Sequence, residues 1–327
     1  MSVRAWWVGA AVLVSLGMAQ VERRFLPVEW RKTVVLEGTL DSELLRPELM
    51  AARDSTIYVY DYGDQAVKAF ALDGMLRWRF GRDGRGPGEF VNPTDLQLDR
   101  EGRLWIADPA TSRVTVVSAG GRLIRTVQTE MSIERLLPLD GGRFLGFAFA
   151  GEKPRFDRFD SLGRVQARVR HPAWMDTVPS LVSELRVAAA PDGRQFAIGS
   201  FYSGRLMLLS AGDSVVRDIN AVETHAFPRP ITYSPNERLT VRRLPPESRP
   251  TIRWLTADSE FAYALILGRH EERGRIVDLY RLRDGAYAGS WLLPEPVAAI
   301  TATTRGIAAL VTDPLPSLYH FERRPRR

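Results

Sequence analysis

The chain of 327 residues contains no cysteine. Disulfide bonds, thiolate metal sites, cysteine nucleophiles and lipid attachment through an N-terminal cysteine are therefore all excluded. A fold without such cross-links depends on its hydrophobic core. The content of 45% hydrophobic and 26% charged residues is ordinary for a globular protein that has one.

Lysine is nearly absent too, since Lys32, Lys68 and Lys153 are the only three. The formal net charge of +6 is therefore carried by arginine. The arginines are scattered among acidic residues, and the densest group is the C-terminal segment 323–327. Because this distribution lacks the basic stripe that nucleic-acid binding requires, we expect no nucleic-acid partner.

Long apolar runs are confined to the N-terminus. Arg4 precedes the apolar segment 5–16, and Gly17-Met18-Ala19 places small residues where a signal peptidase reads. This pattern predicts a signal peptide over residues 1–19, and an uncleaved anchor is the alternative. We therefore expect a secreted or periplasmic protein that is monomeric and has no transmembrane domain in its mature form.

Familiar catalytic motifs are scarce. The chain has no Gly-x-Ser-x-Gly elbow, so it carries no signature of an acyl-transfer nucleophile. The glycine-rich segment 81–88 superficially suggests a phosphate loop, but that motif needs a following helix. Prolines and strand-like residues surround the segment instead, and we interpret it as a connector.

The chain does contain a repeat. Residues 53–80 align without gaps on residues 100–127, so that Asp61 corresponds to Asp108 and Gly74 to Gly121. A period of about 47 residues, built from short alternating strands and glycine turns, is typical of a β-propeller.

The same rhythm continues towards the C-terminus. The second strand of each unit is predicted to begin near residue 57, 104, 144, 195, 262 or 307, which gives six units. The last unit lacks an outer strand, whereas segment 32–37 reads as a strand without a unit. Pairing it beside segment 317–321 would complete the last blade and leave no free edge there.

We therefore predict an all-β fold. It is a six-bladed β-propeller of four-stranded antiparallel blades, closed by the N-terminal strand, in one domain spanning residues 20–327. A proline-rich insertion at about 221–250 separates the fourth and fifth units. Since proline removes the donors of a strand ladder, we expect a long ordered loop there without regular strands.

The segment from Gly81 to Ile124 resembles the NHL repeat. The resemblance is carried by Gly86-Pro87-Gly88-Glu89-Phe90, Pro93, Gly102, the run Trp105 to Asp108, and Arg113-Val114 before a glycine turn. It implies a six-bladed propeller of the exported bacterial type that binds a protein, peptide or glycan. A minority of such proteins are enzymes, namely histidine-metal peptidyl-hydroxyglycine lyases, calcium-dependent lactonases and related hydrolases.

The insertion and the connectors 84–90 and 171–179 are expected on one face, around the entrance of the central channel. Their arginine and aromatic side chains suit carboxylates, extended peptides and sugars. The predicted ligand-binding residues are Arg85, Phe90, His171, His225, Phe227, Arg229, Tyr233 and Arg238. The first functional hypothesis is therefore a non-catalytic binding or scaffold module at this loop face.

Histidines supply the alternative hypothesis. His171, His225 and His270 are predicted on loops of the same face, where three imidazoles and a water could form an open zinc site. Their flanking residues differ, so the favoured interpretation is three unrelated surface histidines. The alternative function is a lyase or lactonase that uses Zn or Ca in the channel, with no catalytic residue assigned.

The repeated aspartates do not indicate a metal site. Asp61 and Asp108 end corresponding strands, but calcium needs several carboxylates that converge. We interpret both as structural and expect Asp108 to hydrogen-bond with Arg113.

Overall fold

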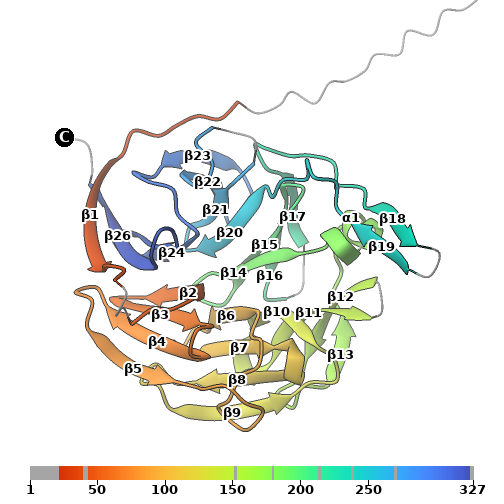
Figure 1. Ribbon diagram of the computed structural model, residues 1–327, viewed down its shortest axis with the longest axis horizontal. Coiled ribbons are helices and arrows are strands. Elements are labelled where there is room, and N and C mark those ends of the chain that lie inside the picture. The colour runs from red at the N-terminus through yellow and green to blue at the C-terminus, as the bar shows by residue number, and fades with distance from the viewer. Residues whose placement is uncertain are drawn as a thin grey trace, which may run out of the picture.

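The computed structural model describes residues 22–39, 43–150, 153–178, 180–212, 215–236, 239–268 and 271–324. Over these ranges the chain forms six four-stranded antiparallel sheets around a central axis (Figure 1). The prediction of a six-bladed β-propeller is confirmed. The signal peptide predicted over residues 1–19 lies outside the described residues. No helix within the described ranges is long and apolar enough to cross a membrane.

Each of the first three blades is built from consecutive strands that run from the channel to the perimeter. The first blade comprises β2 (Pro47–Arg53), β3 (Thr56–Asp61), β4 (Ala66–Ala71) and β5 (Leu76–Phe80). The second comprises β6 (Asp95–Leu98), β7 (Leu104–Asp108), β8 (Arg113–Val117) and β9 (Leu123–Gln128). The third comprises β10 (Ile133–Pro138), β11 (Phe144–Ala150), β12 (Lys153–Phe159) and β13 (Val165–Arg168).

The fourth and fifth blades follow the same plan. The fourth comprises β14 (Leu185–Ala189), β15 (Gln195–Ser200), β16 (Arg205–Ser210) and β17 (Val215–Asn220). The fifth comprises β20 (Ile252–Ala257), β21 (Phe261–Ile266), β22 (Ile276–Arg281) and β23 (Tyr287–Leu292). The helical elements are short: α1 (Trp174–Thr177) and the 3-10 turns η1 (Pro109–Thr111), η2 (Asp140–Gly142) and η3 (Ser180–Val182).

The sixth blade joins the two ends of the chain. It comprises β24 (Ala299–Thr303), β25 (Gly306–Val311), β26 (Ser317–Arg324) and the N-terminal strand β1 (Glu29–Leu36). β1 pairs antiparallel with β26, with Lys32 opposite Phe321. The predicted closure is therefore confirmed, and it gives the last blade the outer strand that it lacked.

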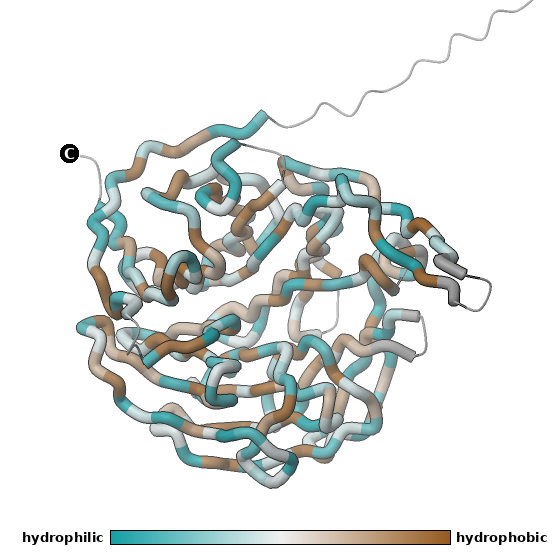
Figure 2. Tube along the Cα trace, in the orientation of Figure 1, coloured by the Kyte–Doolittle hydropathy of each residue, from teal (hydrophilic) through white to brown (hydrophobic). Residues whose placement is uncertain are grey.

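The core lies between the blades. Buried hydrophobic side chains form clusters that each join two neighbouring blades, including the first with the second and the sixth with the first. Middle strands such as β3, β4 and β7 are buried along their whole length because blades cover both of their faces. Figure 2 accordingly shows hydrophobic segments spread around the ring.

The repeated aspartates bind the main chain of the connectors through hydrogen bonds. The Asp61 carboxylate accepts the N–H groups of Leu45 and Arg46 at 2.8 and 2.7 Å, just before β2. Asp108 accepts the N–H groups of Val91 and Asn92, before β6. The structural interpretation of both residues fits this geometry, since each carboxylate fixes the segment that enters its own blade.

The expected bond between Asp108 and Arg113 is not formed. The two residues face each other in the β7–β8 register, but the Arg113 guanidinium donates to the carbonyls of Gly86 and Arg85 at 2.8 and 2.7 Å. The reason is that the glycine-rich connector lies within reach and offers free carbonyl oxygens, while main-chain donors occupy Asp108.

The proline-rich insertion differs from its prediction. It contains a hairpin of β18 (Ile231–Asn236) and β19 (Leu239–Arg243), so the expectation of no regular strand is wrong. Most of its prolines flank the hairpin, and Pro235 falls where the register skips between Tyr233 and Asn236. Figure 1 shows the hairpin projecting from the outer perimeter of the ring beside α1.

Candidate functional site

The central channel contains a cavity of about 700 Å³. This volume lies within the range of about 300–1,000 Å³ that is usual for small-ligand sites. Its walls come from the inner strands β2, β6, β10, β14, β20 and β24, with β10 contributing Arg135. It also reaches the turns after three of these strands, at Asp54, Asp99 and Ser259. Because these strands belong to all six blades, only ring closure assembles the site.

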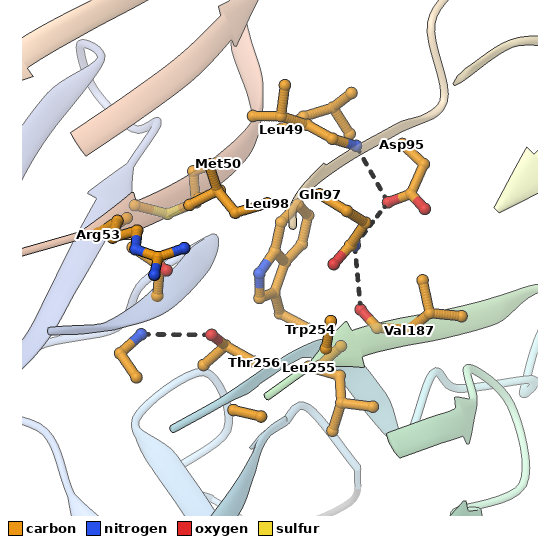
Figure 3. A pocket seen from close by; sticks show the side chains of 18 of the residues that line it. Leu49, Met50, Arg53, Asp95, Gln97, Leu98, Val187, Trp254, Leu255 and Thr256 are labelled. Atoms are coloured by element: carbon orange, nitrogen blue, oxygen red, sulfur yellow. Dashed lines mark hydrogen bonds between the residues drawn. The ribbon is translucent and has the colours of Figure 1, made fainter. Parts of the chain in front are cut away.

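Trp254 on β20 provides the largest aromatic surface of this cavity. Its side chain is half-buried, whereas its neighbour Leu255 is buried in the core between blades. Figure 3 shows the Trp254 indole in the middle of the lining, with Gln97, Leu98 and Val187 around it. An indole in this position offers a flat apolar face to a bound molecule.

The indole N–H of Trp254 is also available. Trp30, Trp78 and Trp105 donate their N–H groups to protein acceptors at 2.8, 3.0 and 2.8 Å. Within the part of the chain that the structure describes, Trp254 has no such acceptor. A buried or half-buried indole N–H usually has a hydrogen-bond acceptor. The N–H of Trp254 can therefore donate to a bound ligand.

Gln97 and Arg53 add polar groups with fixed orientations. The Gln97 amide donates to Asp95 Oδ1 at 2.9 Å and to the Val187 carbonyl at 3.3 Å, which defines the position of its oxygen. One terminal nitrogen of Arg53 donates to the Asp99 carbonyl at 2.7 Å. Each side chain therefore has one group engaged by the protein and another that can face a ligand.

Asp95 has a positioning role. Its carboxylate accepts the N–H of Leu96 at 3.0 Å, the N–H of Leu136 in the third blade at 2.8 Å, and the Gln97 amide. Burial raises the pKa of Asp95, against the attraction of Arg135 and these hydrogen bonds. Asp95 thus joins two blades and orients Gln97.

Several residues predicted from the sequence lie elsewhere. Phe90 is fully buried, with ring centroids 5.5 and 6.1 Å from Tyr60 and Phe80. Arg85 is exposed, and its carbonyl accepts the bond from Arg113. Neither residue lines the channel cavity.

The connector after the third blade and the insertion do meet. Phe227 stacks on Trp174 of α1, with ring centroids 5.9 Å apart. His171 lies 3.8 Å from Asp176, and His225 lies 3.3 Å from Glu223. In Figure 1, α1 lies at the outer side of the ring, and none of these residues lines the channel cavity.

The remaining predicted residues belong to the insertion or lie outside the described chain. Arg229 is exposed, and Tyr233 is 53% exposed with the Arg243 guanidinium 5.6 Å from its ring centre. Arg238 and His270 lie outside the described residues.

The described residues do not form the metal site of the alternative hypothesis. Among them, no group of three or more histidine, cysteine, aspartate or glutamate side chains is arranged to hold a metal ion. The part of the channel lining that the structure describes also contains no histidine. Neither a zinc nor a calcium ligand set can therefore be assigned to these side chains.

The sequence analysis missed Trp254, Gln97 and Arg53. The repeat signal is strongest in the second strands, whereas these three residues lie on inner strands. A usable signal was the run before the turn at Asp258-Ser259, which contains Ile252, Trp254, Leu255 and Ala257. This pattern indicates an inner strand, but not that its tryptophan lines a channel.

Comparisons with known proteins agree with the fold. Residues 32–160 match the model of a family described as a 6-bladed beta-propeller. The chain is 34% identical over 73 residues to human NHL repeat-containing protein 3, a match that covers 21% of each protein. It thus spans about a fifth of the length of this curated relative. The resemblance to NHL-repeat propellers is confirmed.

Solved structures show the same architecture. A gluconolactonase from Xanthomonas campestris is 12% identical, with a TM-score of 0.52 and 90% of each chain covered. A candidate exported protein from Bacteroides fragilis is 10% identical, with a TM-score of 0.53, covering 92% of this chain and 96% of its own. At these identities the likeness concerns the fold alone.

Proposed function

We propose that the protein is a binding module that holds a carbohydrate in the central channel. The observation that carries this proposal is Trp254, a half-buried indole with an unused N–H group in a cavity of about 700 Å³. The apolar C–H face of a sugar ring packs on the indole, and a ring or hydroxyl oxygen accepts its N–H bond.

The surrounding polar groups support this ligand class. The Gln97 oxygen can accept a hydroxyl proton, and Arg53 can donate to a sugar oxygen. The lining also contains a group of threonines, whose hydroxyl groups both donate and accept: Thr94, Thr256, Thr301, Thr303 and Thr304. Hydrogen-bonding groups beside an aromatic face suit a polyhydroxylated ring.

The size of the cavity narrows the range of partners considered above. A folded protein cannot enter a cavity of this size, whereas a mono- or oligosaccharide can. We also propose that the chain is exported, on the strength of the N-terminal pattern, and shared architecture with a candidate exported protein supports this. Secretion and periplasmic retention are both compatible with a sugar-binding role.

The test is a binding titration. The purified protein, beginning at Gln20, is titrated with a panel of neutral and uronic-acid oligosaccharides while tryptophan fluorescence is recorded. Trp254→Ala should weaken binding by tenfold or more, in line with the loss of about 1.5 kcal/mol for an aromatic contact. Trp78→Ala is the matched control, because Trp78 lies on outer strand β5 and donates to Ala119.

Binding that is unchanged in Trp254→Ala, or absent for every oligosaccharide, would contradict the proposal. A parallel assay with added Zn or Ca measures turnover of lactone and peptidyl-hydroxyglycine substrates. Metal-dependent product formation would favour the lyase or lactonase alternative over a binding module.

A further inference from the structure

A second cavity of about 400 Å³ lies at the other end of the channel. Its walls come from the beginnings of inner strands, at Pro47, Arg253 and Ala298, and from connections between second and third strands, at Phe201 and Thr312. The larger cavity instead reaches the ends of the inner strands. Glu48, Arg186 and Trp254 line both cavities and so lie where the two adjoin.

Positive charge dominates the smaller cavity. Arg46, Arg186 and Arg253 line it, against Glu48 as the single acid of the described lining. The Arg46 Nε lies 3.8 Å from Glu48, while its side chain remains 64% exposed. Glu184, which lies outside the lining, pairs with Arg186, so Glu48 is left to balance both Arg46 and Arg253.

Arg253 is the cation with the fewest partners. Its Nε donates to the Ala298 carbonyl in the next blade at 2.6 Å. Within the described part of the chain, its terminal nitrogens have no acceptor and no carboxylate forms an ion pair with it. Burial lowers the pKa of Arg253, with only the charge of Glu48 acting against it.

Arg186 lies beside Arg253 in this cavity. Its Nε donates to the Arg253 carbonyl at 2.7 Å, and its guanidinium lies over the Phe201 ring, 4.4 Å from the centroid. Glu184 pairs with it at 2.6 Å. Burial, followed by repulsion from Arg135, nevertheless lowers the pKa of Arg186 to about 10. A partly desolvated cation whose pKa is lowered is stabilised by any anion that approaches it.

The rest of the wall is apolar. Leu45, Pro47, Phe201, Leu310 and Pro316 surround the guanidinium groups. A phosphate would leave this apolar surface uncovered, whereas an organic acid can fill it. The planar guanidinium also matches a carboxylate through two parallel hydrogen bonds.

We propose that this second cavity binds the carboxylate group of a small organic acid, with Arg253 and Arg46 holding the charge and the apolar wall holding the body of the ligand. The site does not depend on carbohydrate binding in the larger cavity, because Arg46 and Arg253 do not line that cavity.

The experiment compares two matched probes. N-acetyl-phenylalanine carries an apolar ring and a carboxylate, and N-acetyl-phenylalaninamide lacks only the charge. Calorimetric titration of the folded protein should show binding of the acid at least tenfold tighter than of the amide, because charge-assisted bidentate bonds to arginine are lost. Inorganic phosphate is the third probe and should bind more weakly than the acid.

Variants locate the site. Arg253→Gln should weaken binding of the acid about tenfold or more. The affinity of Arg253→Lys for the acid should lie between those of Arg253→Gln and the wild type. Arg46→Gln should weaken it severalfold without disturbing the fold, since that side chain is mostly exposed. Arg305→Gln is the control, because Arg305 is 75% exposed and lines neither cavity.

Equal binding of acid and amide would overturn the proposal, as would equal affinities of the Arg46→Gln and Arg305→Gln variants. Phosphate that binds as tightly as the acid would overturn the carboxylate assignment. Oligosaccharide binding by Arg46→Gln separates the two proposals. Arg46 lines only the smaller cavity, so this variant should lose affinity for the acid and keep its affinity for oligosaccharides.

Discussion

The ammonium group of Lys68 lies 3.0 Å from Oδ2 of Asp61, and both side chains are almost completely buried. Lys68 also lies 3.0 Å from Asp64. Since Asp61 holds the N–H groups of Leu45 and Arg46, this charge cluster connects the first blade to the segment that follows the closing strand. One of only three lysines in the chain thus has a structural position.

Replacing this lysine should destabilise the protein strongly. Lys68→Met leaves Asp61 as a buried carboxylate without its counter-charge, which costs about 3–5 kcal/mol for a broken buried pair. Lys32→Met is the matched control, because Lys32 pairs with Glu295 at the surface and such pairs contribute about 1 kcal/mol or less. Urea denaturation of both variants measures the difference, and equal losses would contradict the buried role of Lys68.

Asp61 should also make stability depend on acid pH. Burial acts to raise the pKa of Asp61, but the N–H groups of Leu45 and Arg46 and the Lys68 ammonium outweigh it and lower the pKa. A carboxyl with a lowered pKa in the folded state contributes stability above its unfolded pKa of about 4 and loses it as the pH falls further.

The check is the free energy of unfolding measured between about pH 6 and pH 2 for the wild type and Asp61→Asn. The wild type should lose stability towards the acid end, and the variant should start lower and lose less. Parallel curves for the two proteins would show that another carboxyl group causes the acid sensitivity.

Ring closure should depend on Trp30. Its indole packs edge-on against Trp291 at 5.6 Å and donates to the Leu292 carbonyl at 2.8 Å, so β1 holds both the sixth and the fifth blade. Trp30→Ala should cost about 3–5 kcal/mol. Deletion of residues 29–36 should abolish cooperative unfolding, because it opens the edge of β26.

Thermal unfolding followed by circular dichroism measures both changes. Leu162→Ala serves as the control, since Leu162 is 65% exposed and its loss should change stability by less than about 0.5 kcal/mol. A deletion variant that unfolds like the wild type would disprove closure by β1.

Two parts of the insertion should contribute differently to stability: the hairpin should contribute little and Phe227 more. Ile231, Tyr233 and Val241 are 39%, 53% and 38% exposed, so replacing residues 231–243 with a short Gly-Ser linker should cost less than about 1 kcal/mol. Phe227→Ala removes the stack on Trp174 and should cost more, about 2 kcal/mol. Chemical denaturation ranks the two variants, and the opposite order would show that the hairpin stabilises the ring.

The blade pattern was readable because its signals are local. Gly102 and Gly121 adopt φ of 77° in their turns, a conformation that glycine reaches without strain, so the repeat marks the hairpins directly. The closing strand could be predicted by elimination, because segment 317–321 lacked a neighbouring outer strand and segment 32–37 belonged to no blade. The hairpin at Ile231–Arg243 was not readable, because nearby prolines dominate the pattern although most of them lie outside the strands.

The sequence by itself determined the number of blades, their strand order and the closure, since short-range alternation and turn glycines specify each of these. Only the tertiary structure decided which side chains line the channel. Arg53, Gln97, Arg186 and Trp254 lie on different inner strands far apart in the chain, and curvature of the ring brings them to one axis. The long insertion leaves the ring between the fourth and fifth blades, so its β18–β19 hairpin lies at the outer side of the ring and neither Phe227 nor Tyr233 lines the channel cavity.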